Sequence, residues 1–181
     1  MKLILIRHTS VNVPKGMIYG QLDVPLANLF NEEALKVLEK LDLPFDAVFS
    51  SPLTRCTQLA QKISSIVSID KRLMELDFGD WEGKYWNDID ESAEAQKWFA
   101  DFVNTSAPKG ESYIDLIDRC RLFLNEIISE GQERVCIVSH GGPIRAFLSL
   151  IEGVIPEKAF ERKIEFGEVI QFTLSQQIKK L

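Results

Sequence analysis

The chain has 181 residues, enough for one α/β domain with a well-buried core but short for two domains that each fold alone. Its composition, 45% apolar and 27% charged, is typical of an ordinary globular protein. The formal charge of −6 argues against nucleic acid or an anionic membrane as the main partner, although a few converging arginines could still bind a phosphate.

Cysteine usage and hydropathy bear on localisation. No stretch approaches the ~20 apolar residues that a membrane span needs, and the apolar run at 3–6 is too short for a signal peptide. Cys56, Cys120 and Cys136 have no C-x-x-C spacing and suit buried thiols in a reducing compartment. We therefore expect a cytoplasmic protein with no nucleic-acid or membrane partner. The polar tail at 175–181 is expected to be partly disordered.

Apolar runs and amphipathic segments alternate along the chain. Short β-branched runs predict strands at 2–6, 46–49 and 134–138, and an alternating run predicts an antiparallel edge strand at 169–174. Apolar periodicity and end signals predict helices at 31–41, from Ser51-Pro52 to about 66, at 93–103, at 111–128 and from Gly142-Pro143 to about 151. This order predicts a single domain over 1–181, a three-layer α/β/α sandwich with a mostly parallel central sheet.

The only two histidines follow predicted strands. His8 comes directly after the first apolar run and Arg7, and His140 comes directly after the run that ends at Val138-Ser139. Arg55 falls in the first turn of the helix that follows the second run. Open parallel sheets bind ligands just beyond the carboxyl ends of their strands. We therefore expect these two histidines and two arginines to converge on one site.

Two arginines with two imidazoles suit a tetrahedral phosphate. Guanidinium groups bind phosphate oxygens in pairs, and a protonated imidazole would add a further donor. Gly141 and Gly142 could add backbone N–H groups at a helix N-terminus. The alternative is that each histidine is a polar residue at a strand end, bonded to backbone. The coincidence of four such groups at strand ends favours the phosphate site.

Four segments in order resemble the motifs of the histidine phosphatase superfamily, also called phosphoglycerate-mutase-like. They are Leu5-Ile6-Arg7-His8-Thr9, the second arginine segment at 50–60, the acidic segment at 73–83, and Val138-Ser139-His140-Gly141-Gly142. Together they span residues 1 to about 150. The family usually continues R-H-G-E-T, whereas this chain has Thr9, Ser10 and Val11 after the first histidine.

The resemblance implies a role for each matching residue. His8 would attack phosphorus and carry the phosphoryl group, as a neutral imidazole whose protonation is opposed by Arg7 and Arg55. These arginines and His140 would hold the phosphoryl oxygens, and Glu75 would be the general acid and base. Such a site requires no cofactor or metal, and the histidines lack the close spacing of a metal site. The other acids of the loop, Asp77, Asp80 and Glu82, are expected to shape it.

The segment at 18–26 resembles α-ribazole phosphatases, which dephosphorylate α-ribazole 5′-phosphate late in cobalamin assembly. Tyr19 and Gln21 are then candidates for substrate contacts, with turn packing as the alternative. The aromatic residues at 81–102 could form a lid, within 81–110, on which a flat base stacks. The alternative, favoured for most of Trp98, Phe99 and Phe102, is that they pack a helix onto the core.

Three other functions stay open at this point. A phosphoglycerate-type mutase is disfavoured because the chain is compact and has few spare basic residues near the motifs. A broad-specificity phosphatase is harder to reject, since the motifs fix the reaction and not the leaving group. A catalytically inactive phosphate-binding module is disfavoured because all five family positions are filled. The expected partner is a small phosphomonoester, and a homodimer is left open.

Overall fold

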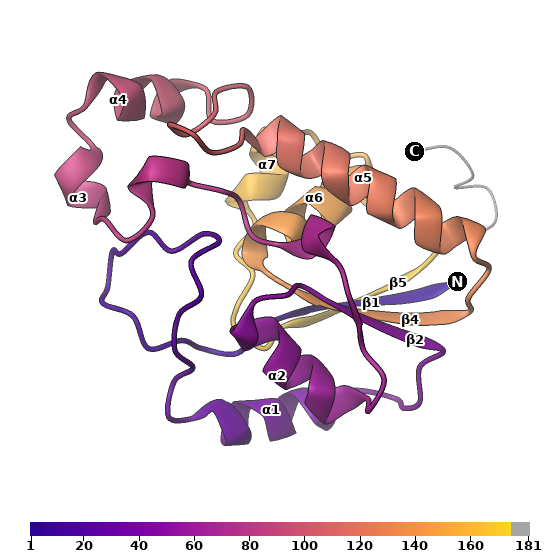
Figure 1. Ribbon diagram of the computed structural model, residues 1–181. Helices are drawn as coiled ribbons and strands as arrows, with labels where there is room; N and C mark the ends of the chain where they lie inside the picture. The colour runs from indigo at the N-terminus through magenta and orange to yellow at the C-terminus, as the bar shows by residue number, and fades with distance from the viewer. Residues whose placement is uncertain (175–181) are drawn as a thin grey trace.

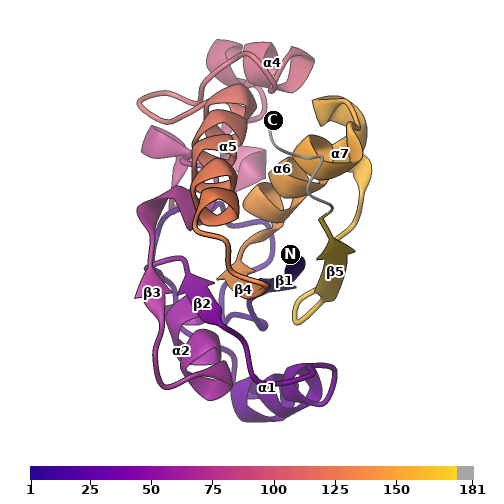
Figure 2. The same ribbon diagram turned by 90° about the vertical axis from the view of Figure 1, so that its right-hand side faces the viewer.

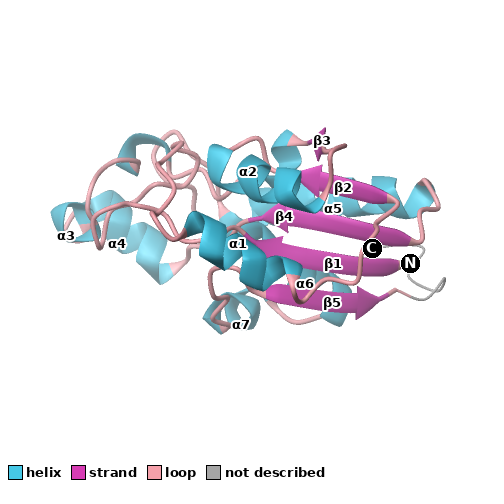
Figure 3. Cartoon of the chain, turned by 90° about the horizontal axis from the view of Figure 1, so that it is seen from below, coloured by secondary structure: helices cyan, strands magenta, loops and turns pink. Residues whose placement is uncertain are grey.

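A five-stranded sheet with the strand order β3-β2-β4-β1-β5 runs through the molecule (Figures 1 and 3). The computed structural model describes residues 1–174, so the predicted tail at 175–181 lies outside the described residues. The strands are β1 (Lys2–Arg7), β2 (Ala47–Ser50), β3 (Ser68–Ile69), β4 (Arg134–Ser139) and β5 (Val169–Thr173). Neighbours from β3 to β1 are parallel, and β5 is antiparallel to β1. The prediction of a mostly parallel sheet with an antiparallel edge is confirmed.

Helices cover both faces of this sheet (Figures 1 and 2). One face carries α1 (Phe30–Leu38) and α2 (Thr54–Ile63), and the other carries α5 (Tyr113–Ser129) and α6 (Gly141–Glu152). Alternate residues of β1 divide between the layers: Ile4 belongs to the core with α1 and α2, and Leu5 to the core with α5 and α6. Burial on both faces explains the continuous apolar runs and confirms the three-layer sandwich.

Smaller elements complete the chain. They are the 3-10 turns η1 (Lys71–Leu73) and η2 (Gly79–Trp81) and the short helices α3 (Trp86–Ile89), α4 (Ala93–Ala100) and α7 (Pro156–Glu161). In Figures 1 and 3, α3 and α4 lie beyond the carboxyl ends of the parallel strands. The strand β3 and the helices α3 and α7 were not predicted, because so few residues show no measurable periodicity.

The prediction that Ser51 caps a helix beginning at Pro52 was wrong. The helix α2 begins at Thr54, with Leu53 at its N-cap and no side-chain cap. The Ser51 hydroxyl accepts the N–H of Leu53 at 3.4 Å, ahead of the helix, and lies 2.8 Å from Nε2 of His140, so it also makes a long-range contact. The predicted start of α5 is close to the observed one, where Ser112 and Asp115 form a capping box.

Three parallel strands end side by side. Arg7 at the end of β1 pairs in register with Ser139 of β4, and Ser50 of β2 pairs with Val138. The chain continues from these ends into His8, Ser51 and His140, and the N–H of His8 donates to the carbonyl of Ser139 at 2.9 Å. The strand order thus brings together two histidine motifs that lie far apart in the sequence. No helix within residues 1–174 is long and apolar enough to cross a membrane.

Candidate active site

His8 is buried, with 1% of its surface exposed, and its ring orientation is fixed by one hydrogen bond. Its Nδ1 lies 2.7 Å from the carbonyl oxygen of Thr9. A carbonyl only accepts, so Nδ1 carries the proton and Nε2 keeps its lone pair. Burial, and next the charge of Arg55, hold the pKa of His8 well below its usual value. The imidazole is therefore neutral at physiological pH, as predicted.

Arg55 extends from the first turn of α2 into the site and is completely buried. Its Nη1 and Nη2 donate to the carbonyls of Leu22 and Gly20, at 2.9 and 2.6 Å. Its Nε donates to Nδ1 of His140 at 3.2 Å. No carboxylate neutralises it within the described residues, so its positive charge remains available in the site.

His140 lies against His8, with ring centroids 5.1 Å apart and the rings steeply inclined to each other. Because its Nδ1 accepts from Arg55, its proton lies on Nε2, which faces the hydroxyl of Ser51. Burial, and next the neighbouring His8, hold the pKa of His140 well below its usual value. The structure therefore contains a neutral His140 with both nitrogens engaged, and not the protonated donor expected from the sequence.

Arg7 is the second arginine of the site. Its Nη1 donates to the carbonyl of Ile164 at 2.5 Å, and its guanidinium lies 4.0 Å from the ring centre of Phe166. Its Nε is buried with no hydrogen-bond partner among the described residues. Phe166 also lies 5.4 Å from the His8 ring. A desolvated N–H next to the predicted nucleophile is suited to a phosphate oxygen.

Glu75 approaches the same site from the loop after η1. Its Oε1 accepts from the backbone N–H of Gly142 at 3.0 Å and from its neighbour Leu76 at 2.9 Å. A Cβ on Gly142 would lie 2.1 Å from Oε1, so glycine permits this approach. The predicted acid is therefore fixed at the N-terminus of α6, one residue from Gly141.

The loop that contains Tyr19 and Gln21 closes another side. The Tyr19 ring lies 5.3 Å from the Arg55 guanidinium, and the positive charges of Arg7 and Arg55 both act on its hydroxyl. Gln21 donates its side-chain amide to the Glu75 carbonyl at 3.1 Å, and its backbone N–H donates to Glu82 at 2.6 Å. Tyr19 thus faces the two arginines, whereas Gln21 supports the acidic loop. Glu82 shapes the loop, as expected.

Sequence reasoning missed an ion pair behind Glu75. Arg119 of α5 donates to the Glu75 carbonyl at 3.0 Å and to the Arg72 carbonyl at 2.6 Å. Glu111 pairs with Arg119 at 2.6 Å and accepts the N–H of Asp77 at 3.0 Å. The pair therefore binds the backbone on both sides of Glu75. In the sequence Arg119 is only a polar position on an amphipathic helix, and no signal distinguishes it.

The aromatic residues at 81–102 pack on one another. Trp81 and Trp98 are buried and lie 5.9 Å apart, and Trp98 also contacts Trp86, Phe99 and Phe102. Phe99 is 47% exposed. For the buried residues, such as Trp98, the favoured alternative therefore holds: they pack a helix onto the core. A lid within 81–110 stays a prediction.

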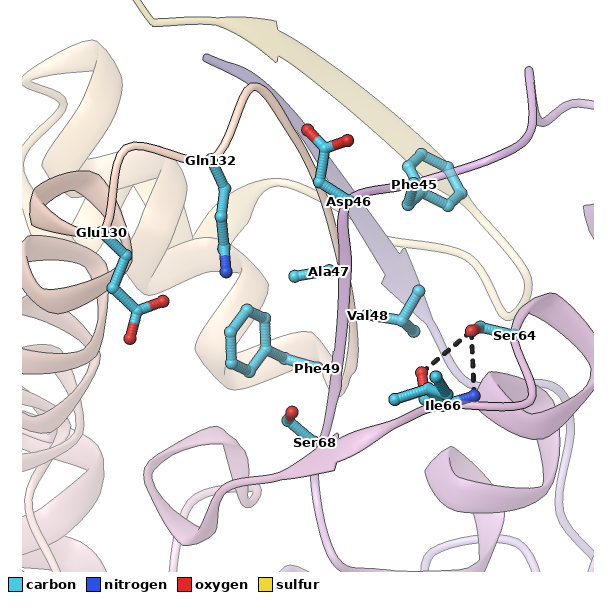
Figure 4. Close-up of a pocket in the computed structure, with 10 residues that line it drawn as sticks. All are labelled: Phe45, Asp46, Ala47, Val48, Phe49, Ser64, Ile66, Ser68, Glu130 and Gln132. Atoms are coloured by element: carbon cyan, nitrogen blue, oxygen red, sulfur yellow. Dashed lines mark hydrogen bonds between the residues drawn. The ribbon is translucent and has the colours of Figure 1, made fainter.

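A surface groove of about 430 Å³ lies at the other end of β2 (Figure 4). Its lining includes Asp46, Glu130 and the apolar side chains of Phe45 and Phe49, with no lysine or arginine. Ser64 and Ile66 lie on the right-hand side of its lining in this view and are joined by two hydrogen bonds. This lining is acidic and apolar, so the groove does not suit a phosphate. Across residues 1–174, no group of three or more His, Cys, Asp or Glu side chains could hold a metal ion.

The fold, and the histidines and arginines gathered at this end of the sheet, define an enzyme that acts on phosphoryl groups. Residues 3–180 match the model of the Histidine phosphatase superfamily (branch 1), and the chain belongs to this family. It is a phosphatase of that superfamily with the phosphoglycerate-mutase-like fold, as predicted.

Individual relatives carry different names. The chain is 30% identical over 168 residues to glucosyl-3-phosphoglycerate phosphatase of Mycolicibacterium vanbaalenii, covering 84% of this chain and 75% of that one. It is 28% identical over 163 residues to phosphoserine phosphatase 1 of Hydrogenobacter thermophilus, covering 85% and 77%. The structure of α-ribazole phosphatase from Shigella flexneri aligns with a TM-score of 0.88 at 26% identity, covering 98% and 92%. These three relatives are named as phosphatases of different substrates, whereas two further relatives, from Azorhizobium caulinodans and Afipia carboxidovorans, are named as 2,3-bisphosphoglycerate-dependent phosphoglycerate mutases.

Proposed function

We propose that this chain hydrolyses phosphomonoesters through a phosphohistidine on His8, without a metal ion. The observation that carries the proposal is the state of His8, a buried neutral imidazole whose Nδ1–H is fixed by Thr9, while Nε2 has no hydrogen-bond partner among residues 1–174. A neutral imidazole nitrogen with an available lone pair is a competent nucleophile. The guanidinium groups of Arg7 and Arg55, neither of which pairs with a carboxylate within residues 1–174, provide the positive charge that a metal supplies elsewhere.

In the first step, Nε2 of His8 attacks phosphorus while the bond to the ester oxygen breaks. Arg7, Arg55 and His140 hold the phosphoryl oxygens, with the backbone N–H of Gly141 at the N-terminus of α6 as a further donor. His140 must release Ser51 to contact the phosphate, because both of its nitrogens are engaged. Glu75, in its protonated form, gives its proton to the departing alkoxide.

In the second step, water attacks the phosphohistidine. Glu75, now a carboxylate, takes a proton from that water as the oxygen bonds to phosphorus. The Nε2–phosphorus bond breaks, which restores neutral His8 and releases inorganic phosphate. Over the cycle Glu75 regains the proton that it gave up and His8 loses the phosphoryl group that it took, so water is the only other reactant.

The physiological substrate is a separate proposal. α-Ribazole 5′-phosphate, and with it a place in cobalamin biosynthesis, is supported by the resemblance at 18–26, by Tyr19 beside the arginines and by the similarity to an α-ribazole phosphatase structure. The burial of Trp81 and Trp98 removes one argument for it, because buried rings cannot stack on a flat base. A broad-specificity phosphatase and a phosphoglycerate-type mutase remain the alternatives.

Phosphate release with EDTA present tests the reaction. Wild type and His8→Ala are compared on p-nitrophenyl phosphate, α-ribazole 5′-phosphate and 3-phosphoglycerate. Turnover that persists in EDTA and disappears in His8→Ala supports the phosphohistidine mechanism. Activity lost to EDTA, or retained by His8→Ala, refutes it. A strong preference for α-ribazole 5′-phosphate supports the pathway, and equal activity across the panel rejects the pathway while keeping the phosphatase.

Glu75→Gln tests the general acid. This variant should lose more activity on alkyl phosphates than on p-nitrophenyl phosphate, because p-nitrophenolate leaves without a proton. An equal relative loss on both kinds of substrate would show that Glu75 does not protonate the leaving group.

A further inference from the structure

A third arginine faces the site and has no role in the phosphate chemistry described above. Arg145 lies one turn into α6, and helix side chains point toward the N-terminus, here the end where Gly141 meets the site. A Cβ built on Gly141 would lie 2.9 Å from Nη1 of Arg145 and 3.8 Å from Cζ of Arg7. The two guanidinium groups therefore flank the same glycine.

The Arg145 guanidinium is incompletely used. Its Nε donates to the carbonyl of Arg162 at 2.7 Å, and its Cζ lies 5.2 Å from the ring centre of Phe160. These contacts fix the side chain. Within residues 1–174, its two terminal nitrogens have no hydrogen bond and no carboxylate within 4.0 Å. A guanidinium group that is fixed in place and has two terminal nitrogens available as donors is suited to bind an anion.

A second unpaired group lies in the same environment. Tyr113, the first residue of α5, is fully buried, and its hydroxyl has no hydrogen-bond partner among the described residues. Its ring lies 5.5 Å from the ring of Phe160, which Arg145 also contacts, and the charge of Arg145 acts on its hydroxyl. A buried hydroxyl without a partner is costly unless a ligand or water bonds to it. Arg145 and Tyr113 therefore offer donors on the Glu75 side of the site.

The position of this pair indicates which part of a substrate it meets. The transferred phosphoryl group has three non-bridging oxygens, and Arg7, Arg55 and His140 already serve them in the proposed mechanism. Arg145 lies against Gly141, and the next residue along, Gly142, donates its N–H to Glu75, the group assigned to the leaving oxygen. A donor pair near Glu75 would thus contact the leaving group. The planar fork of one guanidinium matches a carboxylate.

We propose that Arg145, assisted by the Tyr113 hydroxyl, binds a carboxylate on the leaving group, so that the preferred substrates are small phosphomonoesters with a carboxylate near the ester oxygen. This inference rests on the proposed function. It favours the chemistry shared by phosphoserine and phosphoglycerate compounds over that of α-ribazole 5′-phosphate, whose leaving group has no carboxylate.

The test uses two substrates that differ in one group. 3-Phosphoglycerate and glycerol 3-phosphate share a three-carbon skeleton, and a hydroxymethyl group replaces the carboxylate in the second. Wild type should prefer 3-phosphoglycerate in kcat/KM by roughly 10- to 100-fold, the value of a charge-assisted paired hydrogen bond. In Arg145→Leu this ratio should fall toward one, and Arg145→Lys should restore part of it. The matched control is Arg121→Leu, an arginine that pairs with Asp118 on α5 and should leave the ratio unchanged.

The ratio of the two kcat/KM values is unaffected by any loss of activity that is equal for both substrates. A wild-type ratio near one overturns the proposal, and so does an Arg145→Leu variant that loses both activities equally, since Arg145 would then act on the phosphate or on folding. Tyr113→Phe should lower the ratio less than Arg145→Leu.

A binding measurement separates this proposal from the failure of catalysis. Calorimetry on His8→Ala should give at least tenfold tighter binding of 3-phosphoglycerate than of glycerol 3-phosphate, and the difference should disappear in His8→Ala/Arg145→Leu. Such a difference in affinity would support the carboxylate subsite even if the wild-type protein hydrolysed no substrate and the proposed function were refuted. Equal binding of the two compounds to His8→Ala would overturn the subsite while leaving p-nitrophenyl phosphate hydrolysis to decide the function.

Discussion

The carboxylate of Glu75 accepts the backbone N–H of Gly142 at 3.0 Å, which joins the acidic loop to the first turn of α6. The Cβ of any other residue at 142 would lie 2.1 Å from that same carboxylate oxygen and 3.2 Å from the Leu116 side chain. The closeness of the contact therefore depends on a missing side chain. It places Glu75 beside Gly141, where the phosphate is proposed to bind.

Gly142→Ala should consequently displace Glu75 without changing any charge. We expect kcat on alkyl phosphates to fall by up to about 100-fold, the cost of moving a catalytic group by an ångström, with a smaller loss on p-nitrophenyl phosphate. Steady-state kinetics on both substrates measures this. In the double variant Glu75→Gln/Gly142→Ala, the alanine should add little to the loss caused by Glu75→Gln alone, because the glutamine that it displaces cannot act as an acid. Fully additive losses would mean that Gly142 acts by another route.

Arg119 should act as a positioning residue for Glu75. It donates to the Glu75 carbonyl at 3.0 Å and is itself paired with Glu111. Arg119→Leu frees the loop on which Glu75 is carried, so we expect kcat on alkyl phosphates to fall roughly tenfold while KM changes little. Kinetics on alkyl and p-nitrophenyl phosphates checks this prediction.

The neighbouring Arg121 provides the control for that experiment. It lies two residues further along α5 and pairs only with Asp118 among the described residues. Arg121→Leu should keep wild-type kcat and wild-type dependence on the leaving group. If Arg119→Leu reduced both kinds of substrate equally, or raised KM alone, its role would be structural and not the positioning of the acid.

The sequence predicted the fold because the strongest signals were local. The runs at 2–6 and 134–138 are apolar almost throughout, and this pattern requires burial on both faces and hence a parallel sheet between helices. The same runs lead directly into His8 and His140, so the candidate catalytic histidines follow the carboxyl ends of the strands. For this reason the amino-acid sequence alone predicts the convergence of the histidines and arginines.

What could not be predicted depends on contacts between distant residues. Ser51 precedes a proline and has the pattern of a helix cap, but its hydroxyl pairs with His140, 89 positions away, and the helix begins later. Arg119 and Arg145 occupy ordinary polar positions on amphipathic helices. Their contacts, with the Glu75 loop and with the edge of the site, follow from how α5 and α6 pack against other segments. Helical periodicity carries no information on either contact.

The two histidines should have opposite tautomers at neutral pH. His8 donates from Nδ1 to the Thr9 carbonyl, whereas His140 accepts at Nδ1 from Arg55. Long-range ¹H–¹⁵N correlation spectra, simple to assign because the chain has two histidines, should therefore show an Nδ1–H form for His8 and an Nε2–H form for His140. An Nε2–H form of His8 would block the proposed nucleophile and contradict the mechanism. Thr9→Ala serves as a control, because the backbone carbonyl remains.

Burial of both histidines should make the protein less stable as the pH falls below about 6.5. In the folded chain the pKa of each is held well below its usual value, first by burial. Below the unfolded pKa of about 6.5, the unfolded state therefore binds protons that the folded state does not. The derivative of the unfolding free energy with pH is then positive, so stability falls on acidification, by up to roughly 1.4 kcal/mol per pH unit for each histidine. Urea titrations from neutral to mildly acidic pH measure this slope. A His8→Gln/His140→Gln variant should flatten it, because glutamine does not titrate, and an unchanged slope in that variant would assign the acid sensitivity to other groups.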